Sequence, residues 1–90
     1  MSTDVVLATG NRHKLAELKL VLAEVAPQLR AVGQSEHGEP PEIAETGSTF
    51  AANAELKARG IAAWLRERGV AGDTWVLADD SGISVAALGG

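Results

Sequence analysis

Four short apolar runs along the chain have the length of buried β-strands. They occupy residues 5–8, 29–32, 75–78 and 83–88, and Arg30 is the one charged residue among them. The first and third runs stop abruptly at turn-forming or acidic residues, which is typical of strands that end at the edge of a sheet. We therefore expect strands at these four positions.

Two longer segments repeat their apolar residues at helical spacing. The first, residues 15–25, follows steps of three, four and three, and Pro27 ends it. The second begins after Thr49, a residue able to cap a helix, and stops at Gly69. Gly60 inside it costs about 1 kcal/mol relative to alanine, which indicates close packing. The expected core-facing positions are Leu15, Leu18, Leu22 and Val25, then Phe50, Ala54, Ala58, Ile61, Ala62 and Leu65.

The segment between residues 33 and 47 has the composition of a long loop. It carries Pro40, Pro41 and four glutamates but no lysine or arginine. Loops of this length inside compact domains are commonly either functional or disordered. The order of strands and helices predicts an α/β fold whose mixed, partly parallel sheet is flanked by helices. Parallel pairing would bring the ends of the first and third strands to one edge, where open α/β sheets bind ligands.

Composition limits the core that such a fold can build. The chain has 90 residues, enough for one domain, but 16 of them are alanine and only three are aromatic. So thin a core favours a chain whose residues 1–90 are one portion of a single domain, and hence a fold that is truncated; the resemblance described below implies that this is the amino-terminal portion. We expect Trp64 and Trp75 to pack in this core or at its edge.

Charge and hydropathy narrow the classes of function. The formal charge of −4 disfavours binding to a nucleic acid polymer but leaves room for a single nucleotide held by local donors and a metal. No apolar run approaches the roughly 20 residues that cross a bilayer. Asp4 stands where a secretion signal would carry basic residues. The chain contains no cysteine, so nothing favours an oxidising compartment. We therefore expect a cytoplasmic protein without membrane contact.

Residues 9–14 are the first of three segments unusually rich in polar groups. They join the end of a strand to the start of a helix, where backbone N–H groups and the helix dipole favour an anion. Gly10 would let a phosphate approach and Lys14 adds a positive charge. The spacing is not that of a Walker A loop, and an ordinary capped turn is the alternative. The candidate substrate-binding residues are Thr9, Gly10, Asn11, Arg12, His13 and Lys14.

The second segment follows the third strand and contains Asp79, Asp80, Ser81 and Gly82. Successive side chains of a strand point to opposite faces, so we expect different roles for the two aspartates. One of them could activate water or bind Mg²⁺, which prefers carboxylate oxygens and phosphate. Capping of the following turn is the alternative. No histidine is placed to activate Ser81 as a nucleophile, so we expect it to contact a ligand or the turn.

The third segment, residues 45–57, joins the acidic loop to the second helix. Asn53 and Lys57 are four residues apart, hence on one helix face, and could present donors to a ligand. A solvated helix face for Lys57 and a solvated loop for Glu45 are the alternatives. If the strands gather all three segments at one edge of the sheet, a lysine, a helix amino end and carboxylates would converge there.

At these three segments the sequence resembles the inosine triphosphate pyrophosphatase family, also described as dITP/XTP pyrophosphatases. The family's Ser/Thr-Gly-Asn-x-x-Lys motif corresponds to residues 9–14. Its Glu-x-Gly-x-Thr-Phe-x-x-Asn-Ala-x-x-Lys-Ala motif corresponds to residues 45–58, with Ala52 where many members have glutamate. Its Ala-Asp-Asp-Ser-Gly-hydrophobic motif corresponds to residues 78–83. The resemblance covers the first half of the family, and the later motifs that contact the purine base are not among these 90 residues.

The resemblance implies Mg²⁺-dependent hydrolysis of ITP, dITP and XTP to the monophosphate and pyrophosphate, which removes deaminated purines from the nucleotide pool. Residues 9–14 would bind the substrate, with Lys14 on the phosphates. Asp80 would be the proton acceptor and a metal ligand, Glu45 a second metal ligand and Ser81 a substrate contact. The full-length protein would be a homodimer.

Two other classes of function compete with this hypothesis. The chain could bind a nucleotide or Mg²⁺ without turnover, in which case calorimetry would detect binding and no product would form. Paired aspartates at a strand end also occur in signalling receiver domains. A receiver, however, needs its acidic pair after the first strand, where this chain has residues 9–11, Thr-Gly-Asn.

Overall fold

The computed structural model describes residues 3–70, 72–79 and 83–87. The elements in chain order are β1 (Thr3–Leu7), α1 (Arg12–Val25), β2 (Leu29–Gly33), the short 3-10 helix η1 (Gln34–His37), α2 (Phe50–Glu67), β3 (Trp75–Asp79) and β4 (Ile83–Ala87). The expected order of strands and helices is confirmed. The sequence did not indicate η1, which lies inside the predicted 33–47 loop.

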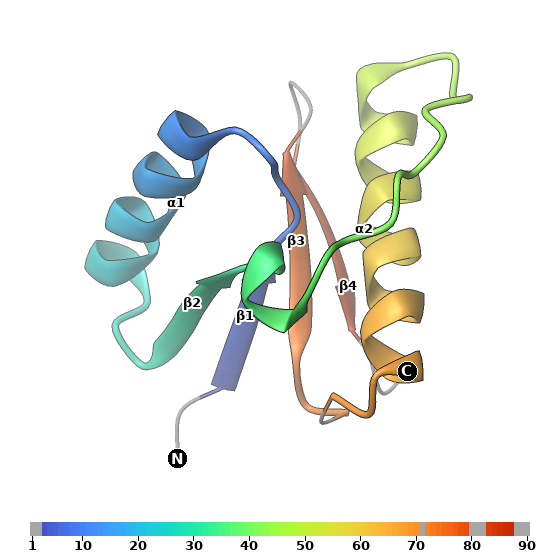
Figure 1. Ribbon diagram of the computed structural model, residues 1–90. Coiled ribbons are helices and arrows are strands. Elements are labelled where there is room, and N and C mark those ends of the chain that lie inside the picture. Colours follow the sequence, from blue (N-terminus) through green and yellow to red (C-terminus); the bar gives the residue numbers. More distant parts are fainter. Residues whose placement is uncertain (1–2, 71, 80–82, 88–90) are drawn as a thin grey trace.

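The four strands form one sheet in the order β2-β1-β3-β4. Strand β1 is parallel to both β2 and β3, whereas β3 and β4 are antiparallel. The predicted mixed, partly parallel α/β fold is therefore confirmed. Figure 1 shows the sheet as a middle layer with α1 on one side and α2 on the other. Because β1 and β3 are parallel neighbours, their carboxyl ends lie at the same edge of the sheet.

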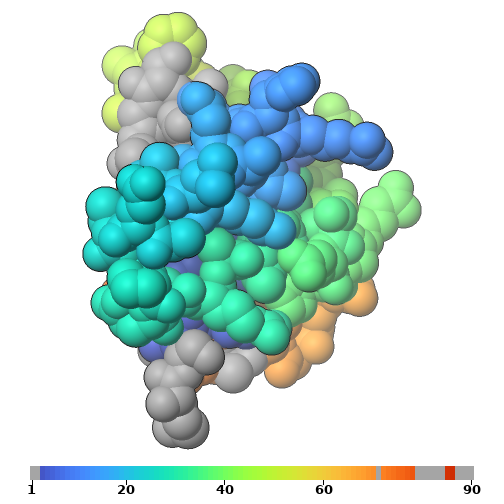
Figure 2. All heavy atoms as spheres, turned by 90° about the vertical axis from the view of Figure 1, so that its left-hand side faces the viewer, coloured from blue at the N-terminus to red at the C-terminus, as the bar shows by residue number. Residues whose placement is uncertain are grey.

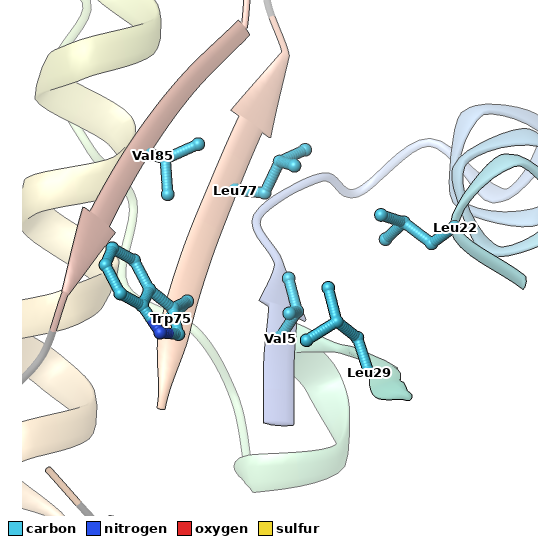
Figure 3. Close-up of a pocket in the computed structure, with 6 residues that line it drawn as sticks. All are labelled: Val5, Leu22, Leu29, Trp75, Leu77 and Val85. Atoms are coloured by element: carbon cyan, nitrogen blue, oxygen red, sulfur yellow. The ribbon is translucent and has the colours of Figure 1, made fainter. Parts of the chain in front are cut away.

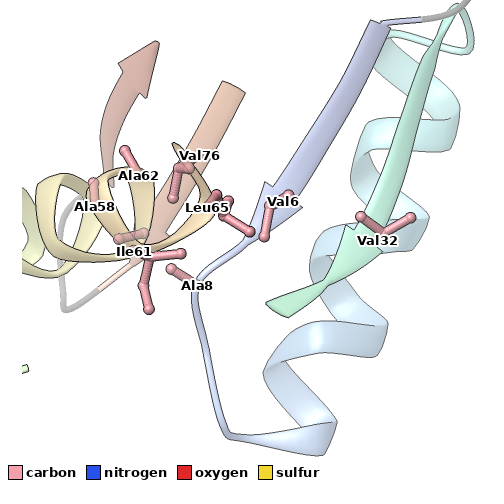
Figure 4. Close-up of a cluster of buried hydrophobic side chains, with 9 residues drawn as sticks. Val6, Ala8, Val32, Ala58, Ile61, Ala62, Leu65 and Val76 are labelled. Carbon is pink, nitrogen blue, oxygen red and sulfur yellow. The ribbon is translucent and has the colours of Figure 1, made fainter. Parts of the chain in front are cut away.

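The hydrophobic core lies between the sheet and α2 (Figure 4). The buried side chains that α2 contributes are Ala54, Ala58, Ile61, Ala62 and Leu65, as the helical spacing predicted. The sheet contributes Val6, Ala8, Val32, Val76 and Ala78. The expectation for Phe50 is wrong, because its residue is 64% exposed. Phe50 opens the first turn of α2, and Figure 1 shows that this turn extends past the end of the sheet.

Helix α2 begins and ends where the sequence predicted. The Thr49 hydroxyl oxygen accepts a hydrogen bond from the Ala52 N–H at 3.0 Å, and Gly69 has φ 78°, the left-handed conformation that ends a helix. Trp64 packs against the core as expected, and the Arg68 guanidinium lies 5.2 Å from the centre of its ring. Tertiary packing and local capping thus agree along this helix.

Helix α1 covers its face of the sheet less completely. It packs chiefly against β2, and none of its residues is fully buried. Leu15, Leu18 and Leu22 are half-buried as the expected stripe, but the expectation for Val25 is wrong, because Val25 is 72% exposed. Val25 is the last residue of α1 and lies only about 20° from Leu18 at 100° per residue, so its exposure comes from its place at the helix end and not from its direction.

Candidate functional site

The turn between β1 and α1 holds residues 9–14 in a compact, hydrogen-bonded arrangement. The Thr9 hydroxyl oxygen accepts from the Asn11 N–H at 3.2 Å. The Asn11 side-chain oxygen accepts from the N–H groups of His13 and Lys14, at 3.0 and 3.2 Å, and thereby caps α1. Gly10 faces open space, since a Cβ built on it would have no atom within 4 Å. The turn is therefore ordered by its own side chains and open at Gly10.

Two hollows adjoin this turn. The larger, about 240 Å³, lies between the start of α1 and the loop after β2, and residues such as Asn11, Arg12 and Pro40 line it. Figure 2 shows the blue start of α1 beside the green loop on this side of the molecule. The smaller, about 120 Å³, is lined by Ile43 and Lys57 among others. Gly10 lines both hollows, so the turn connects them.

Glu45 and Lys57 form an ion pair between the acidic loop and α2. The Lys57 Nζ lies 3.1 Å from the Glu45 Oε1, and the side chains are 26% and 46% exposed respectively. Lys57 also lines the smaller hollow. Two of the predicted functional residues are thus brought together, although 12 positions separate them in the chain.

Asn53 holds the same loop at a second point. Its side-chain oxygen accepts a hydrogen bond from the Gly47 N–H at 2.8 Å. A Cβ on Gly47 would lie 2.7 Å from the Ala52 Cβ and 2.8 Å from that oxygen, so only glycine fits here without a shift. The face of α2 that carries Asn53 and Lys57 therefore positions the loop. A direct contact of either residue with substrate stays a prediction.

Gly60 provides the space in which this loop packs on α2. A Cβ on Gly60 would lie 2.5 Å from the Cδ1 of Ile43, and Ile43 packs against the core. The close packing predicted at Gly60 is confirmed. Because Ile43 is two residues before Glu45, this contact anchors the part of the loop that carries the candidate metal ligand.

The acidic segment after β3 is placed only up to its first residue. Asp79 ends β3 and stands in register with Ile83 of β4, whereas Asp80 and Ser81 lie outside the described residues. The β1–β3 pairing continues to this edge, since the Ala8 N–H donates to the Leu77 carbonyl at 2.9 Å. The backbone therefore brings the end of β3 beside the start of the 9–14 turn.

The donor chemistry of the loop fits Mg²⁺. Glu45 offers a carboxylate that is 46% exposed, and Mg²⁺ typically binds one or two carboxylates and takes its other ligands from water and phosphate. The described residues contain no cluster of three or more His, Cys, Asp or Glu that could hold a metal. A complete protein ligand set is therefore not present in this part of the chain, but an Mg²⁺ ion does not require one.

Gln34 is a candidate that the sequence analysis missed. It begins η1 directly after β2, is half-buried, and lines both hollows together with Gly10. Its amide can both donate and accept hydrogen bonds. The available signal was its place directly after a strand, at the edge where open α/β sheets bind ligands. Gln34 was not singled out because the composition of the surrounding residues indicated an acidic loop.

Comparison with known proteins gives a consistent result. The sequence model of the Ham1 family matches residues 5–90. A "dITP/XTP pyrophosphatase" of Leuconostoc mesenteroides is 42% identical over 86 residues, which are 96% of this chain and 40% of that protein. One of the same name from a Sulfurovum species is 48% identical over 87 residues, 96% of this chain and 39% of that protein. The chain thus spans about two fifths of the length of these curated relatives and corresponds to their amino-terminal part.

Solved structures of similar sequence have the same fold. "Structure of a HAM1 protein from Coxiella burnetii" matches with a TM-score of 0.66 and 38% identity, over 87% of this chain and 34% of that one. "The structure of the Staphylococcus aureus Ham1 protein" matches with a TM-score of 0.64 and 30% identity, over 84% of this chain and 34% of that one. The predicted fold class and family resemblance are both confirmed.

Proposed function

Because the chain belongs to the Ham1 family, we propose that it forms the phosphate- and metal-binding part of a Mg²⁺-dependent nucleoside triphosphate pyrophosphatase. The substrates would be the deaminated purine nucleotides ITP, dITP and XTP, and the products the monophosphate and pyrophosphate. The observation that carries the proposal is the convergence of the 9–14 turn with Lys57, which Glu45 holds by an ion pair, around adjoining hollows. Relatives named "dITP/XTP pyrophosphatase" support the substrate class.

The triphosphate would bind at the amino end of α1. Gly10 leaves open space beside the backbone, and the positive end of the helix dipole favours an anion at that position. Lys14 in the first turn of α1 and Lys57 in the smaller hollow would contribute positive charge to the phosphates. Together these groups would offset the charge of the triphosphate and hold it along the carboxyl edge of the sheet.

Hydrolysis would require a carboxylate as proton acceptor and a second one beside the phosphates. Asp80 would accept the proton of a water molecule that attacks the α-phosphorus, while the bond to the bridging oxygen breaks and pyrophosphate leaves. Glu45 and Asp80 would be the carboxylate ligands of Mg²⁺, which when bound supplies charge neutralisation and orients the phosphoryl group. Lys57, 3.1 Å from Glu45, would keep that carboxylate in position.

The test is an assay of pyrophosphate release. A chimera in which this chain replaces the matched part of the Leuconostoc mesenteroides relative is incubated with ITP, dITP, XTP or ATP in the presence of Mg²⁺. We expect release from the first three substrates and little from ATP. No release from any of the three would contradict the proposal.

Substitutions in the chimera assign the roles. Asp80→Asn should lower kcat by at least about 100-fold, the usual contribution of a positioned acid or base. Glu45→Gln should raise the Mg²⁺ concentration that gives half-maximal rate. Glu55→Gln is the matched control, since Glu55 pairs with Arg59 on the exposed surface of α2 and should change neither quantity. An unchanged rate in Asp80→Asn would contradict the assignment.

The 90-residue chain alone distinguishes turnover from binding. Calorimetric titration with ITP and Mg²⁺ that shows heat of binding without hydrolysis would indicate a nucleotide-binding part whose catalysis needs further residues. The chain's span of about two fifths of its relatives favours that outcome for the isolated chain. Binding weakened by Lys57→Ala but not by Glu55→Gln would place the nucleotide at the hollows.

Location and partners follow from the proposed substrate. We propose a cytoplasmic location, because the nucleotide pool lies there, and a homodimer for the full-length protein, which sedimentation would test. No helix within the described residues has the length and apolar character needed to cross a membrane. With a net charge of −4, we expect no retention on a DNA or RNA column at physiological salt.

A further inference from the structure

An apolar groove on the α1 side of the sheet differs in chemistry from the two hollows beside the 9–14 turn. Its volume is about 300 Å³, and its lining residues are Val5, Leu22, Leu29, Trp75, Leu77 and Val85. Figure 3 shows these side chains gathered from all four strands and from α1. None of them is charged, so a phosphate fits the two hollows beside the turn and not the groove.

The charged side chains that line the two hollows are basic. Lys57 lines the smaller hollow and Arg12 the larger, and the described lining residues of both include no aspartate or glutamate. Gly10 lines both hollows, so they meet at the turn. An extended anion that passes Gly10 would therefore have one basic side chain in each hollow, an arrangement that suits a triphosphate.

Gln34 brings a polar side chain to the place where the two hollows meet. It lines both of them and is half-buried, and its side chain makes no hydrogen bond to another residue that the structure describes. The side-chain oxygens of Thr9 and Asn11, by contrast, already accept hydrogen bonds from backbone N–H groups. The Gln34 amide is thus available to a ligand that lies across both hollows.

Contacts at both ends of η1 fix the place of Gln34. At the start of η1, the Glu36 Oε2 accepts a hydrogen bond from the Gly33 N–H at 2.9 Å. At its end Gly38 lies against Arg68, since a Cβ built on Gly38 would be 2.7 Å from the Arg68 Nη2. The backbone that carries Gln34 is therefore held in position before a ligand binds, which lowers the entropic cost of binding.

We propose that Gln34 is a further phosphate-binding residue of the nucleotide site. Its side-chain NH₂ group donates a hydrogen bond to a phosphate oxygen where the triphosphate passes Gly10 from one hollow to the other. This role rests on the proposed function, which supplies the triphosphate. A ribose hydroxyl is the competing ligand, because an amide both donates and accepts, but the basic side chains of Lys57 and Arg12 in the same hollows favour phosphate.

Calorimetric titration of the 90-residue chain with inorganic tripolyphosphate and Mg²⁺ tests this contact, because tripolyphosphate has neither ribose nor base. Gln34→Ala should weaken binding at least about tenfold, the size of one hydrogen bond to a charged group. Gln34→Glu keeps the length of the side chain but replaces the donor by a negative charge. It should weaken binding about fivefold more than Gln34→Ala, because two like charges about 4 Å apart repel one another even in water.

Gln28→Ala is the matched control. Gln28 is exposed, precedes the opposite end of β2 and lines neither hollow, so binding should be unchanged. In the chimera with the Leuconostoc mesenteroides relative, Gln34→Ala should raise KM for ITP about tenfold and change kcat less, as expected for a contact that is already made in the bound substrate. Circular dichroism checks that each variant keeps its fold.

Three results would overturn the proposal. The unsubstituted chain could fail to bind tripolyphosphate, or Gln34→Ala could bind it as well as Gln28→Ala does. Weaker binding of ITP but not of tripolyphosphate by Gln34→Ala would assign Gln34 to the nucleoside. Titration measures binding and not hydrolysis. An active chimera with normal binding by Gln34→Ala would therefore overturn the role of Gln34 alone, and an inactive chimera with weakened binding would overturn the enzymatic function alone.

Discussion

The two faces of the sheet contain similar apolar residues but differ in how completely they are covered. On the α2 face, Val6 and Val76 have no exposed surface. On the α1 face, Trp75 in β3 and Val85 in β4 are about half exposed. The difference lies in the position of the helices, because α2 spans β3 and β4 while α1 packs on β2. Burial is thus decided by which helix reaches a residue, not by the residue's hydrophobicity.

The largest expected effect tests the covered face. Ile61→Ala removes a fully buried side chain of α2 and should lower the free energy of unfolding by about 2–5 kcal/mol. Leu22→Ala, at a half-buried position of α1, should lower it by less than half as much. Urea denaturation of both variants measures the difference. Equal losses would show that α1 is packed as tightly as α2.

The next effect concerns the loop that packs on α2. Gly60→Ala gains about 1 kcal/mol of helix propensity, but the new Cβ would lie 2.5 Å from Ile43, and overpacking costs about 1–3 kcal/mol. We expect a net loss of about 1 kcal/mol in thermal unfolding. The additional substitution Ile43→Val removes the clashing Cδ1 and should recover part of it. A more stable Gly60→Ala variant would mean that the loop yields freely.

A smaller effect separates the caps of the two helices. Asn11→Ala removes the acceptor for two N–H groups of α1 and should cost about 1 kcal/mol. Because α1 has little tertiary support, we expect the loss as faster hydrogen exchange in its first turn. Thr49→Ala is the counterpart at α2. There we expect faster hydrogen exchange in the first turn of α2 only, because packing on the sheet protects the rest of the helix. If faster exchange extended equally far along α1 and α2, the proposed difference in their tertiary support would be contradicted.

The smallest effect is expected on the α1 side of the sheet, which is less completely covered. Val25→Ser replaces a residue that is 72% exposed and should change the free energy of unfolding by no more than about 0.5 kcal/mol. The identical change at Val76, which is fully buried, leaves a cavity and buries a hydroxyl, so it should cost at least about 2 kcal/mol. Chemical denaturation compares the pair. A cost at Val25 close to that at Val76 would mean that Val25 is covered in solution.

Sequence reasoning succeeded where the determining interactions are local. The Thr49 cap, the Gly69 stop and the buried stripe of α2 follow from spacing and side-chain chemistry within one helix. It failed at Phe50 and Val25, the terminal residues of their helices, because periodicity gives the direction of a side chain but not what lies opposite it. For Trp75 the sequence predicted packing in the core or at its edge, and the fold determines that the residue is 44% exposed.

The candidate site likewise combines residues that the sequence predicted with contacts that only the fold creates. Each member of the Glu45–Lys57 pair was a candidate from its motif, but their 3.1 Å contact depends on the loop folding onto α2 through Gly60 and Asn53. Gln34 was not a candidate at all, because only the fold places the residue after β2 between the two hollows. The roles of Asp80 and Ser81 stay predictions, since both lie outside the described residues.

By itself the sequence determined the four strands, the two α-helices, their order and the polar segments at the strand ends, because helical and strand periodicity, caps and turns act over a few residues. Only the tertiary structure decided that α2 covers its face of the sheet while α1 leaves an apolar groove beside β3 and β4. The reason is geometric. Coverage depends on where a helix lies across the sheet, and that position is set by packing between residues far apart in the chain.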